Sequence, residues 1–287
     1  PGNVKDWTVN PFKPAVKKNH LIGRGANDMK SSIACFVSAV NKFLKKGKFK
    51  GSISFLITGD EEGFAINGTK KMVEYLKKKK EKIDFCIVGE PTNPNKLGEM
   101  IKIGRRGSLS GKIEIFGVQG HVAYPHLSNN PINALISICK KLKQEKLDKG
   151  NKNFQSSNLE FTTINVDNKA HNVIPARARA QFNIRYNNFH TTNSLKKKIN
   201  FLVKNICKMN RCKFKIEFIA NGDSFLTKPE KTIFMAKKII KRITKITPRF
   251  STTGGTSDAR FIRKIAPCLE FGLVNKTMHK VDECVSL

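Results

Sequence analysis

The stretch ISFLITGDEEG, residues 53–63, is an apolar run that ends at three consecutive carboxylates, Asp60, Glu61 and Glu62. Its length and its β-branched residues predict a buried strand, and Gly59 allows the backbone to turn where that strand ends. Ligand sites in open α/β sheets gather at the carboxyl ends of strands, and three adjacent acids repel one another unless a cation or protonation relieves them. The stretch therefore favours a metal site, although a solvated acidic turn explains it equally well when it is taken alone.

Two further acids occupy comparable positions on either side of this stretch. Asp28 ends the segment LIGRGAND and precedes residues 33–44, whose apolar positions have helical spacing. Its alternative role is that of a helix N-cap. Residues 83–88 predict a second buried strand, and Glu90 follows it directly. The sequence thus predicts an α/β sheet with acids along one edge.

The pattern of elements changes after residue 107 and then changes back. Strands are predicted at residues 110–116, 159–166, 177–186 and 214–219, with one helix that opens at Asn130-Pro131 and another around residues 195–206. This β-α-β-β-α-β order predicts a ferredoxin-like domain. A helix at 230–244 and a strand at 268–272 then resume the α/β pattern. We therefore expect an α/β domain of residues 1–107 and 222–287, interrupted by an inserted domain of residues 108–221.

The composition is strongly basic, with 54 Lys and Arg against 22 Asp and Glu and a formal net charge of +32. The excess is mostly Lys scattered over predicted helix faces, without an arginine and aromatic platform, so nucleic acid is an unlikely partner. The positive field could steer a small anionic substrate. No apolar run approaches the length of a membrane span, and the seven cysteines contain no CxxC pair, as is typical of a reduced cytoplasmic protein.

Nine motifs occur along the chain in a fixed order. They are GRGANDMK (23–30), ITGDEEG (57–63), IVGEPT (87–92), GRRGS (104–108), GVQGHVAYPH (117–126), HNVIP (171–175), FNIRY (182–186), TTGGTSDARFI (252–262) and NKTMHKVDECV (275–285). In this order the chain resembles the M20 family of dinuclear metallohydrolases, and within it the desuccinylases. The resemblance implies a metallopeptidase-like catalytic domain, an inserted lid and dimerisation domain, a homodimer, and two Zn²⁺ or Co²⁺ ions per subunit in the full-length protein.

The resemblance also implies roles for the acids and for two histidines. Asp28 would bridge two metals, Glu90 would bind one of them, and Glu62 and His279 would bind the other. The peptide bond after Asp28 would be cis, which is rare outside proline. Carboxylates and imidazoles without thiolates suit a hydrolytic zinc, cobalt or manganese centre.

Catalysis and substrate binding are assigned in the same way. Glu61 would be the general base, and His121, reaching across the dimer, would stabilise the oxyanion. The positions that match the substrate contacts of the family are Arg105, Asn172, Arg185, Gly255, Thr256, Arg260 and Asn275. These residue types suit a small amide substrate with several carboxylates. Each of them could instead be an ordinary turn glycine or surface arginine.

The chain also departs from the family pattern. The family has an HxD motif upstream of a proline-glycine turn, whereas this chain starts at Pro1-Gly2, and a helix expected after Glu283-Cys284 is missing as well. A fragment and an eroded gene both explain this, and in either case we expect the chain as printed to be inactive or nearly so. His171 stands where the desuccinylases usually have Asn, and Ala259 where they have Gly.

The leading hypothesis is a metal-dependent amidohydrolase of lysine and peptidoglycan-precursor biosynthesis. An acetylornithine deacetylase or another M20 peptidase is the alternative within the same class. A non-catalytic protein, either a degenerate remnant or a basic nucleic-acid binder, is the alternative from a different class, and metal analysis separates it from the enzymes.

Overall fold

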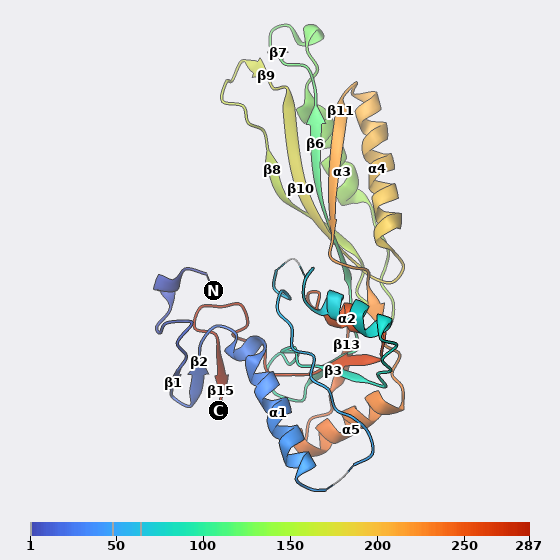
Figure 1. The fold of residues 1–287 in the computed structure, drawn as a ribbon. Helices are drawn as coiled ribbons and strands as arrows, with labels where there is room; N and C mark the ends of the chain where they lie inside the picture. The colour runs from blue at the N-terminus through green and yellow to red at the C-terminus, as the bar shows by residue number, and fades with distance from the viewer. Residues whose placement is uncertain (1, 48, 64) are drawn as a thin grey trace. The chain divides into compact units, whose positions relative to one another are not determined.

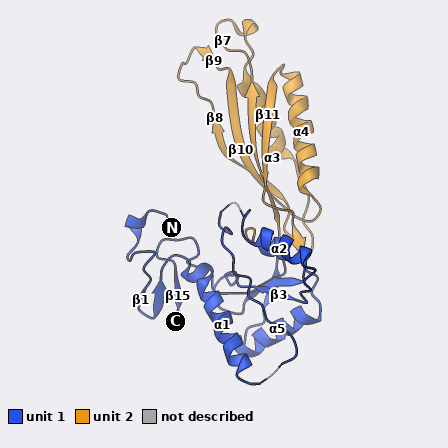
Figure 2. Ribbon diagram, viewed as in Figure 1, with its two compact units in different colours: residues 1–104, 226–252, 257–287 blue, residues 105–225, 253–256 orange. Residues whose placement is uncertain are grey.

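The chain divides into two compact units, which are coloured separately in Figure 2. A computed structural model describes residues 2–47, 49–63 and 65–287 (Figure 1). Unit 1 comprises residues 1–104, 226–252 and 257–287, and unit 2 comprises residues 105–225 and 253–256. Residues 253–256 belong to unit 2, which the sequence did not indicate. These residues contact Arg105, which is about 150 positions earlier in the chain: Arg105 Nη1 lies 3.5 Å from the carbonyl oxygen of Thr253 and 3.4 Å from that of Gly255.

Unit 1 contains two small sheets and their helices. One sheet has the order β13-β4-β14-β3 and the other has the order β1-β2-β15. The elements are η1 (Val4–Asp6), β1 (Ala15–Lys17), β2 (His20–Ile22), η2 (Ala26–Lys30), α1 (Ser31–Leu44), α2 (Thr69–Lys78), β3 (Cys86–Val88), β4 (Met100–Lys102), α5 (Lys231–Thr244), β13 (Arg249–Ser251), α6 (Ala259–Ile262), β14 (Cys268–Glu270) and β15 (Cys284–Ser286). The core of this unit joins Ile101, Ile233 and Leu269, so α5 packs against the sheet. The short strands β5 (Gly104–Arg105) and β12 (Phe225–Leu226) lie where the chain passes between the units.

The strand predicted at residues 53–58 is absent from the structure. Residues 52–58 pair with no strand in the described part of the chain, and the side chains of residues 52–57 are exposed, with Ile53 45% and Ile57 64% accessible. The prediction of a buried strand was therefore wrong. An apolar, β-branched run favours extended backbone, but a strand also needs a hydrogen-bonded neighbour, which a local pattern does not specify.

Unit 2 contains the six elements predicted for the inserted domain, in the predicted order. They are β6 (Gly107–Phe116), α3 (Pro131–Gln144), β8 (Asn158–Asn165), β10 (Arg177–Tyr186), α4 (Thr192–Met209) and β11 (Lys213–Ala220), with β7 (Gly120–His121), η3 (Pro125–Leu127) and β9 (Val173–Ile174) at one end. The sheet is antiparallel with the order β11-β6-β10-β8. Asn130 caps α3 by accepting a hydrogen bond from the Ile132 N–H at 3.0 Å, and Pro131 follows it.

Alternate residues of the central strands of unit 2 face the two helices. Leu109 and Ile113 of β6, and Phe182 and Ile184 of β10, belong to one buried cluster with residues of α3 and α4. The intervening residues of both strands are therefore on the opposite, open face of the sheet, because successive side chains of a strand alternate between its faces. Arg185 is on this open face, paired in register with Ser108.

A buried carboxylate organises the loop between α3 and β8. Asp148 has a side chain only 7% exposed. It accepts hydrogen bonds from Asn187 Nδ2 at 2.6 Å, the Gly150 N–H at 2.7 Å and the Ser157 N–H at 3.2 Å, and lies 3.0 Å from His190 Nε2. Burial alone would raise the pKa of Asp148, but the hydrogen bonds from Ser157, Gly150 and Asn187 outweigh burial, and the pKa is lowered.

We expect the substitution Asp148→Asn to destabilise unit 2 by about 2–3 kcal/mol at neutral pH, because it removes the charge and turns an NH₂ donor toward groups that are themselves donors. A lowered carboxyl pKa gives stability that is present above the ordinary value of about 3.9 and is lost as the pH falls through the folded-state value. The difference in free energy of unfolding between parent and variant should therefore shrink below about pH 4. Urea unfolding at pH 7 and pH 3.5 measures it, and an equal difference at both pH values would contradict the prediction.

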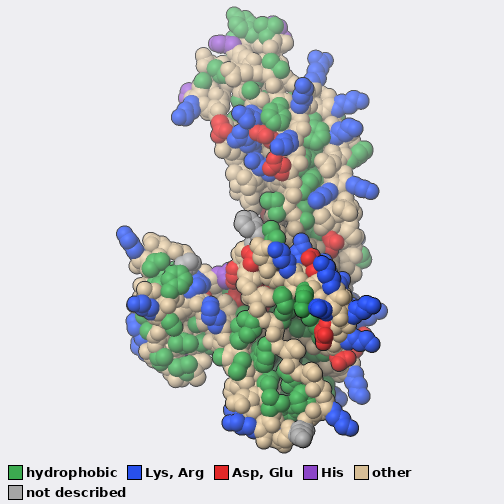
Figure 3. Space-filling model, in the orientation of Figure 1, with side chains coloured by type: hydrophobic (Ala, Val, Ile, Leu, Met, Phe, Trp, Pro, Cys, Tyr) green, Lys and Arg blue, Asp and Glu red, His purple; other side chains and the backbone are tan. Residues whose placement is uncertain are grey.

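Basic side chains are interspersed over the visible surface of both units rather than gathered into one patch (Figure 3). All seven cysteines are free thiols, of which Cys207 and Cys268 are buried and Cys35 is exposed. Within the described residues, no helix combines the length and the apolar character that a membrane crossing requires.

Candidate metal centre

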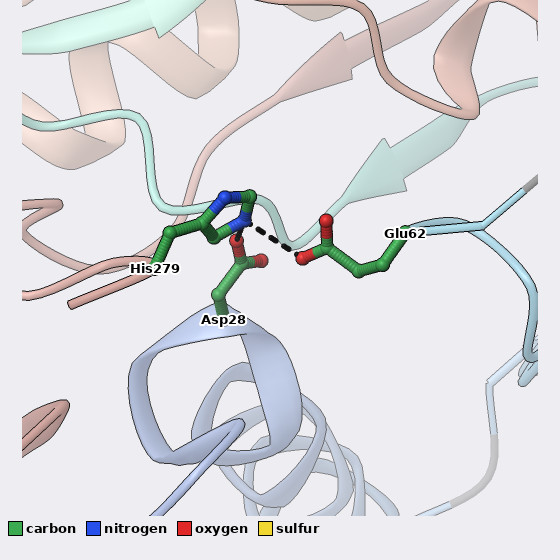
Figure 4. A group of neighbouring side chains, drawn as sticks. All are labelled: Asp28, Glu62 and His279. Atoms are coloured by element: carbon green, nitrogen blue, oxygen red, sulfur yellow. Dashed lines mark hydrogen bonds and ion pairs between the residues drawn. The ribbon is translucent and has the colours of Figure 1, made fainter. Parts of the chain in front are cut away.

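Three of the predicted metal ligands converge in unit 1, as Figure 4 shows. His279 Nε2 lies 2.8 Å from Glu62 Oε1 and 3.2 Å from Asp28 Oδ2. One ligand atom from each of the three residues lies within 4.8 Å of the others. They come from η2, from the loop before α2 and from the loop before β15, so the chain brings together segments more than 200 residues apart.

Asp28 projects from irregular backbone just before α1. Its φ and ψ of −121° and 89° are not helical, and the peptide bond to Met29 is cis, as expected. Helix α1 begins at Ser31 and its N-cap is Lys30. The alternative role of Asp28 as an N-cap is therefore wrong. Its side chain is directed instead toward His279 and Glu62 (Figure 4).

The three consecutive acids of the opening stretch have separate roles. Asp60 Oδ2 accepts hydrogen bonds from the N–H groups of Ile66 at 2.8 Å and Asn67 at 3.0 Å. This carboxylate therefore closes the loop that carries the other two acids, as Asp commonly does in turns. Glu62 is exposed and is bonded to His279.

The ionisation of Glu61 is strongly perturbed. Burial raises the pKa of Glu61 to about 7, and the charges of Asp258 and Glu62 act in the same direction, whereas Arg260 opposes them. Burial, followed by the charge of Glu62, also raises the pKa of Asp28. A group of carboxylates that suppress one another's ionisation is a good receptor for cations, because a cation relieves the repulsion.

The geometry of the three-residue group fits a divalent metal. Two carboxylates and one imidazole are the ligand types of hydrolytic zinc centres. Zinc bonds to such ligands are about 2.0–2.2 Å long, which places ligand atoms of one tetrahedral ion about 3.3–3.6 Å apart. The separations of 2.8 and 3.2 Å from His279 Nε2 are shorter than this range, so the side chains would have to move apart slightly to hold an ion.

The fourth predicted ligand, Glu90, is outside this three-residue group. It follows β3 directly, after Gly89. A Cβ atom at position 89 would lie 2.8 Å from both Met29 Cε and Phe36 Cε2 and 2.9 Å from Ser32 Cβ. Gly89 therefore allows the end of β3 to pack closely against side chains of α1 and against Met29, the neighbour of Asp28.

The predicted substrate-contacting residues fall in both units. Arg260 is in α6 of unit 1, where its Nη1 donates to the Ser257 carbonyl at 3.1 Å, and the N–H of Asn275 donates to the Asn93 carbonyl at 2.8 Å. In unit 2, Arg105 approaches residues 253–256, which include Gly255 and Thr256. A Cβ at Gly254 would lie 2.6 Å from Arg105 Nη1, so the glycine makes room for this guanidinium.

The remaining predicted residues lie in the sheet and loops of unit 2. His121 and Asn172 are exposed and adjacent, because β7 pairs with β9 and the Val122 N–H donates to the Asn172 carbonyl at 3.1 Å. Arg185 is on the open face of β10, where burial, followed by the charge of Arg106, lowers its pKa.

Three charged residues near the predicted sites were not predicted from the sequence. Asp258 is buried and raises the pKa of Glu61, and its place in a glycine-rich acid motif could have indicated it. Arg106 is the neighbour of Arg105, and its buried Nε finds no hydrogen-bond acceptor among the described residues. Glu283 is fully buried and bonded to the backbone around Asp28, a contact that no local pattern indicates.

The chain is similar in sequence to curated desuccinylases. The chain is 66% identical over 288 residues to the succinyl-diaminopimelate desuccinylase of Pelagibacter ubique, spanning 100% of this chain and 75% of the relative. It is 50% identical over 284 residues to the succinyl-diaminopimelate desuccinylase of Methylobacterium radiotolerans, spanning 98% of this chain and 72% of the relative.

Solved structures share the fold. The aminopeptidase PepT of Bacillus cereus matches with a TM-score of 0.78 at 18% identity, over 96% of this chain and 71% of that one. An M20 family metallo-carboxypeptidase of Sulfolobus solfataricus matches with a TM-score of 0.76 at 17% identity, over 99% of this chain and 78% of that one. The model of peptidase family M20/M25/M40 matches residues 1–287. With two relatives at 50% identity or more over almost its whole length, the chain belongs to peptidase family M20/M25/M40.

Proposed function

We propose that the protein is a metal-dependent amide hydrolase that converts N-succinyl-LL-2,6-diaminopimelate and water to succinate and LL-2,6-diaminopimelate. The observation that carries this proposal is the convergence of Asp28, Glu62 and His279 on one point, in a chain 66% identical to a succinyl-diaminopimelate desuccinylase. The reaction belongs to lysine and diaminopimelate biosynthesis, and a cytoplasmic location is proposed with it.

The proposed mechanism assigns one task to each side chain. Asp28, Glu62, His279 and Glu90 would hold two Zn²⁺ or Co²⁺ ions, with Asp28 shared between them. When bound, such ions polarise a carbonyl and lower the pKa of a shared water. Glu61 would take the proton from the attacking water and deliver it to the leaving amine, a task suited to a carboxyl whose pKa is raised to about 7.

The substrate carries three carboxylates, and the protein offers guanidinium groups to match them. Arg105, Arg185 and Arg260 would each bind a carboxylate, since the guanidinium fork fits carboxylate geometry. Gly255, Thr256, Asn172 and Asn275 would add hydrogen bonds. His121 of the partner subunit would donate to the developing oxyanion.

A chimaera tests the proposed reaction. This chain replaces the matching 288 residues of the Pelagibacter ubique desuccinylase, and the purified protein is loaded with Zn²⁺ or Co²⁺. We expect release of succinate from N-succinyl-LL-2,6-diaminopimelate, and loss of that activity on chelation with recovery when metal is added back. Faster hydrolysis of N-acetylornithine would favour the deacetylase, and salt-sensitive DNA binding without metal would favour a non-catalytic protein.

We further propose that unit 2 is a ferredoxin-like lid through which two copies of the protein form a homodimer. The strand order β11-β6-β10-β8 with two helices on one face supports this assignment. Strands β8 and β11 are at the edges of this sheet, and Phe201 of α4 is 69% exposed. In such a dimer we expect the Phe201 side chain to be covered by the partner subunit.

We expect the substitution Phe201→Asp to weaken the dimer at least about tenfold, because an unpaired carboxylate would be buried in the interface. Analytical ultracentrifugation over a range of protein concentrations measures the dissociation constant. The matched control is Met235→Asp, at an exposed apolar position on α5 of unit 1, which should leave it unchanged. A parent protein that is monomeric at micromolar concentration, or an equal effect of both substitutions, would contradict the prediction.

A further inference from the structure

The side chain of Glu283 is fully buried beside the candidate metal centre, but it is not one of the converging ligands. Its Oε1 accepts hydrogen bonds from the N–H groups of Asn27 and Asp28, both at 2.8 Å. Its Oε2 accepts from the Gly25 N–H at 2.9 Å and from Arg24 Nη1 at 2.7 Å. Both oxygens of one carboxylate are therefore used on the short segment from which Asp28 projects.

Burying a carboxylate is unfavourable unless hydrogen bonds and an opposite charge compensate it. Arg24 supplies the opposite charge, and it is itself held by stacking on Trp7, with 4.9 Å from its guanidinium carbon to the ring centre. The residues around Glu283 thus form a complete receptor for its carboxylate.

The contacts of Glu283 join the segments that carry two of the converging ligands. His279 is four residues before Glu283 in the same loop, and Arg24 Nη2 donates to the Lys280 carbonyl at 3.0 Å. The backbone of Glu283 also takes part, since its carbonyl accepts from the Gly23 N–H at 2.9 Å. Asn27 Nδ2 adds a bond to the Val274 carbonyl at 2.9 Å. These contacts hold the loop of His279 beside the backbone of Asp28, whose Oδ2 lies 3.2 Å from His279 Nε2.

We propose that Glu283 is a positioning residue, which clamps the backbone of residues 25–28 to the loop of His279 and thereby presents Asp28 and His279 to one divalent cation. The metal part of this inference rests on the proposed function, whereas the clamp itself is a property of the metal-free chain. Partners that orient ligands without touching the metal typically change metal affinity about 10- to 100-fold when they are removed.

Two substitutions separate the clamp from the negative charge of the carboxylate. Glu283→Gln has nearly the same shape but turns an NH₂ group toward the donors. Glu283→Asp keeps the charge and is one methylene shorter, so it cannot reach the donors of both oxygens. Asp148→Asn is the matched control, because it disrupts an equally satisfied buried carboxylate in unit 2.

The first measurement is amide hydrogen exchange of the metal-free 287-residue chain, followed by NMR. We expect the amides of Gly25, Asn27 and Asp28 to exchange at least about tenfold faster in both Glu283 variants, since hydrogen bonds to a charged acceptor are lost. The control should leave these amides protected. Unchanged protection in the variants would overturn the proposal.

The second measurement is Co²⁺ affinity, by competition with a chromophoric chelator, together with the visible absorption spectrum of bound Co²⁺. We expect both Glu283 variants to bind Co²⁺ about 10- to 100-fold more weakly and with an altered spectrum, and the control to match the parent. Parent-like binding by Glu283→Asp would assign the effect to charge alone and overturn the clamp. If Glu283→Gln does not fold, Glu283→Asp decides both measurements.

The tests of Glu283 succeed or fail independently of the test of the proposed reaction. A chimaera without desuccinylase activity would contradict the proposed function, whereas lost amide protection and weakened Co²⁺ binding would still support the role of Glu283. Failure of both Glu283 variants to change either measurement would leave the proposed reaction intact and remove the clamp.

Discussion

Replacing Glu61 with Gln in the chimaera is expected to lower kcat for N-succinyl-LL-2,6-diaminopimelate by about 10²- to 10⁴-fold, the usual contribution of a general base. Gln has the shape of Glu but cannot accept and return the proton of the attacking water. Glu61 is not among the three converging ligands, so the Co²⁺ affinity should stay within about threefold of the parent value. By contrast, removal of a residue that orients a metal ligand typically weakens metal binding about 10- to 100-fold. Steady-state kinetics and a Co²⁺ titration measure the two quantities.

The pH dependence of activity provides a second test of Glu61→Gln. A base must be ionised to act, so activity falls as the pH drops through the pKa of Glu61. Burial and the charge of Asp258 raise this pKa, toward about 7 in the metal-free chain, whereas cations bound at Glu62 and Asp28 would lower it. The acidic limb of the parent profile is therefore expected below about pH 7, and it should be absent in Glu61→Gln. An unchanged kcat, or an unchanged acidic limb, would exclude Glu61 as the base.

The substitution Asp28→Asn is expected to weaken Co²⁺ binding by more than about 100-fold, beyond what the loss of a supporting partner costs. A carboxylate oxygen of Asp28 lies within 4.8 Å of the ligand atoms of His279 and Glu62. Asp28 would also bind both of the proposed ions, so its substitution would remove a negative charge from beside each of them. A Co²⁺ titration of the 287-residue chain measures the change without reference to catalysis.

The control for Asp28→Asn is Glu74→Gln, which removes the same charge from an exposed position of α2. It should leave the Co²⁺ affinity unchanged. If the two substitutions had equal effects, the measured affinity would reflect the general charge of the protein, and the convergence of the three residues would not describe a metal site.

Several helices and the strands of unit 2 could be predicted because their signals are local. The apolar spacing of residues 33–44 gave α1, and Asn130-Pro131 marked the start of α3 through a cap that the structure contains. Alternation of apolar residues along residues 110–116 and 177–186 placed β6 and β10 correctly, because the same alternation separates their helix-facing side from their open side.

The strand wrongly predicted at residues 53–58 and the contacts of Asp60 show what a local sequence pattern does not specify. An extended apolar run does not specify which strand it will pair with, and within the described residues this segment pairs with none. Three consecutive acids look alike in a sequence, but only the fold shows that Asp60 binds the backbone of its own loop while Glu62 meets His279.

By itself, the sequence determined the residue types available as metal ligands, the order of most elements and the family. These features depend on residue chemistry and on short periodicities, which neighbouring positions in the sequence contain. Only the tertiary structure decided that Asp28, Glu62 and His279 share one point, that Glu90 is outside that group, and that Glu283 binds the backbone beside Asp28. The physical reason is that these relations depend on hydrogen bonds and packing between segments as far apart as residues 28 and 283, and such long-range contacts form only when the whole unit folds.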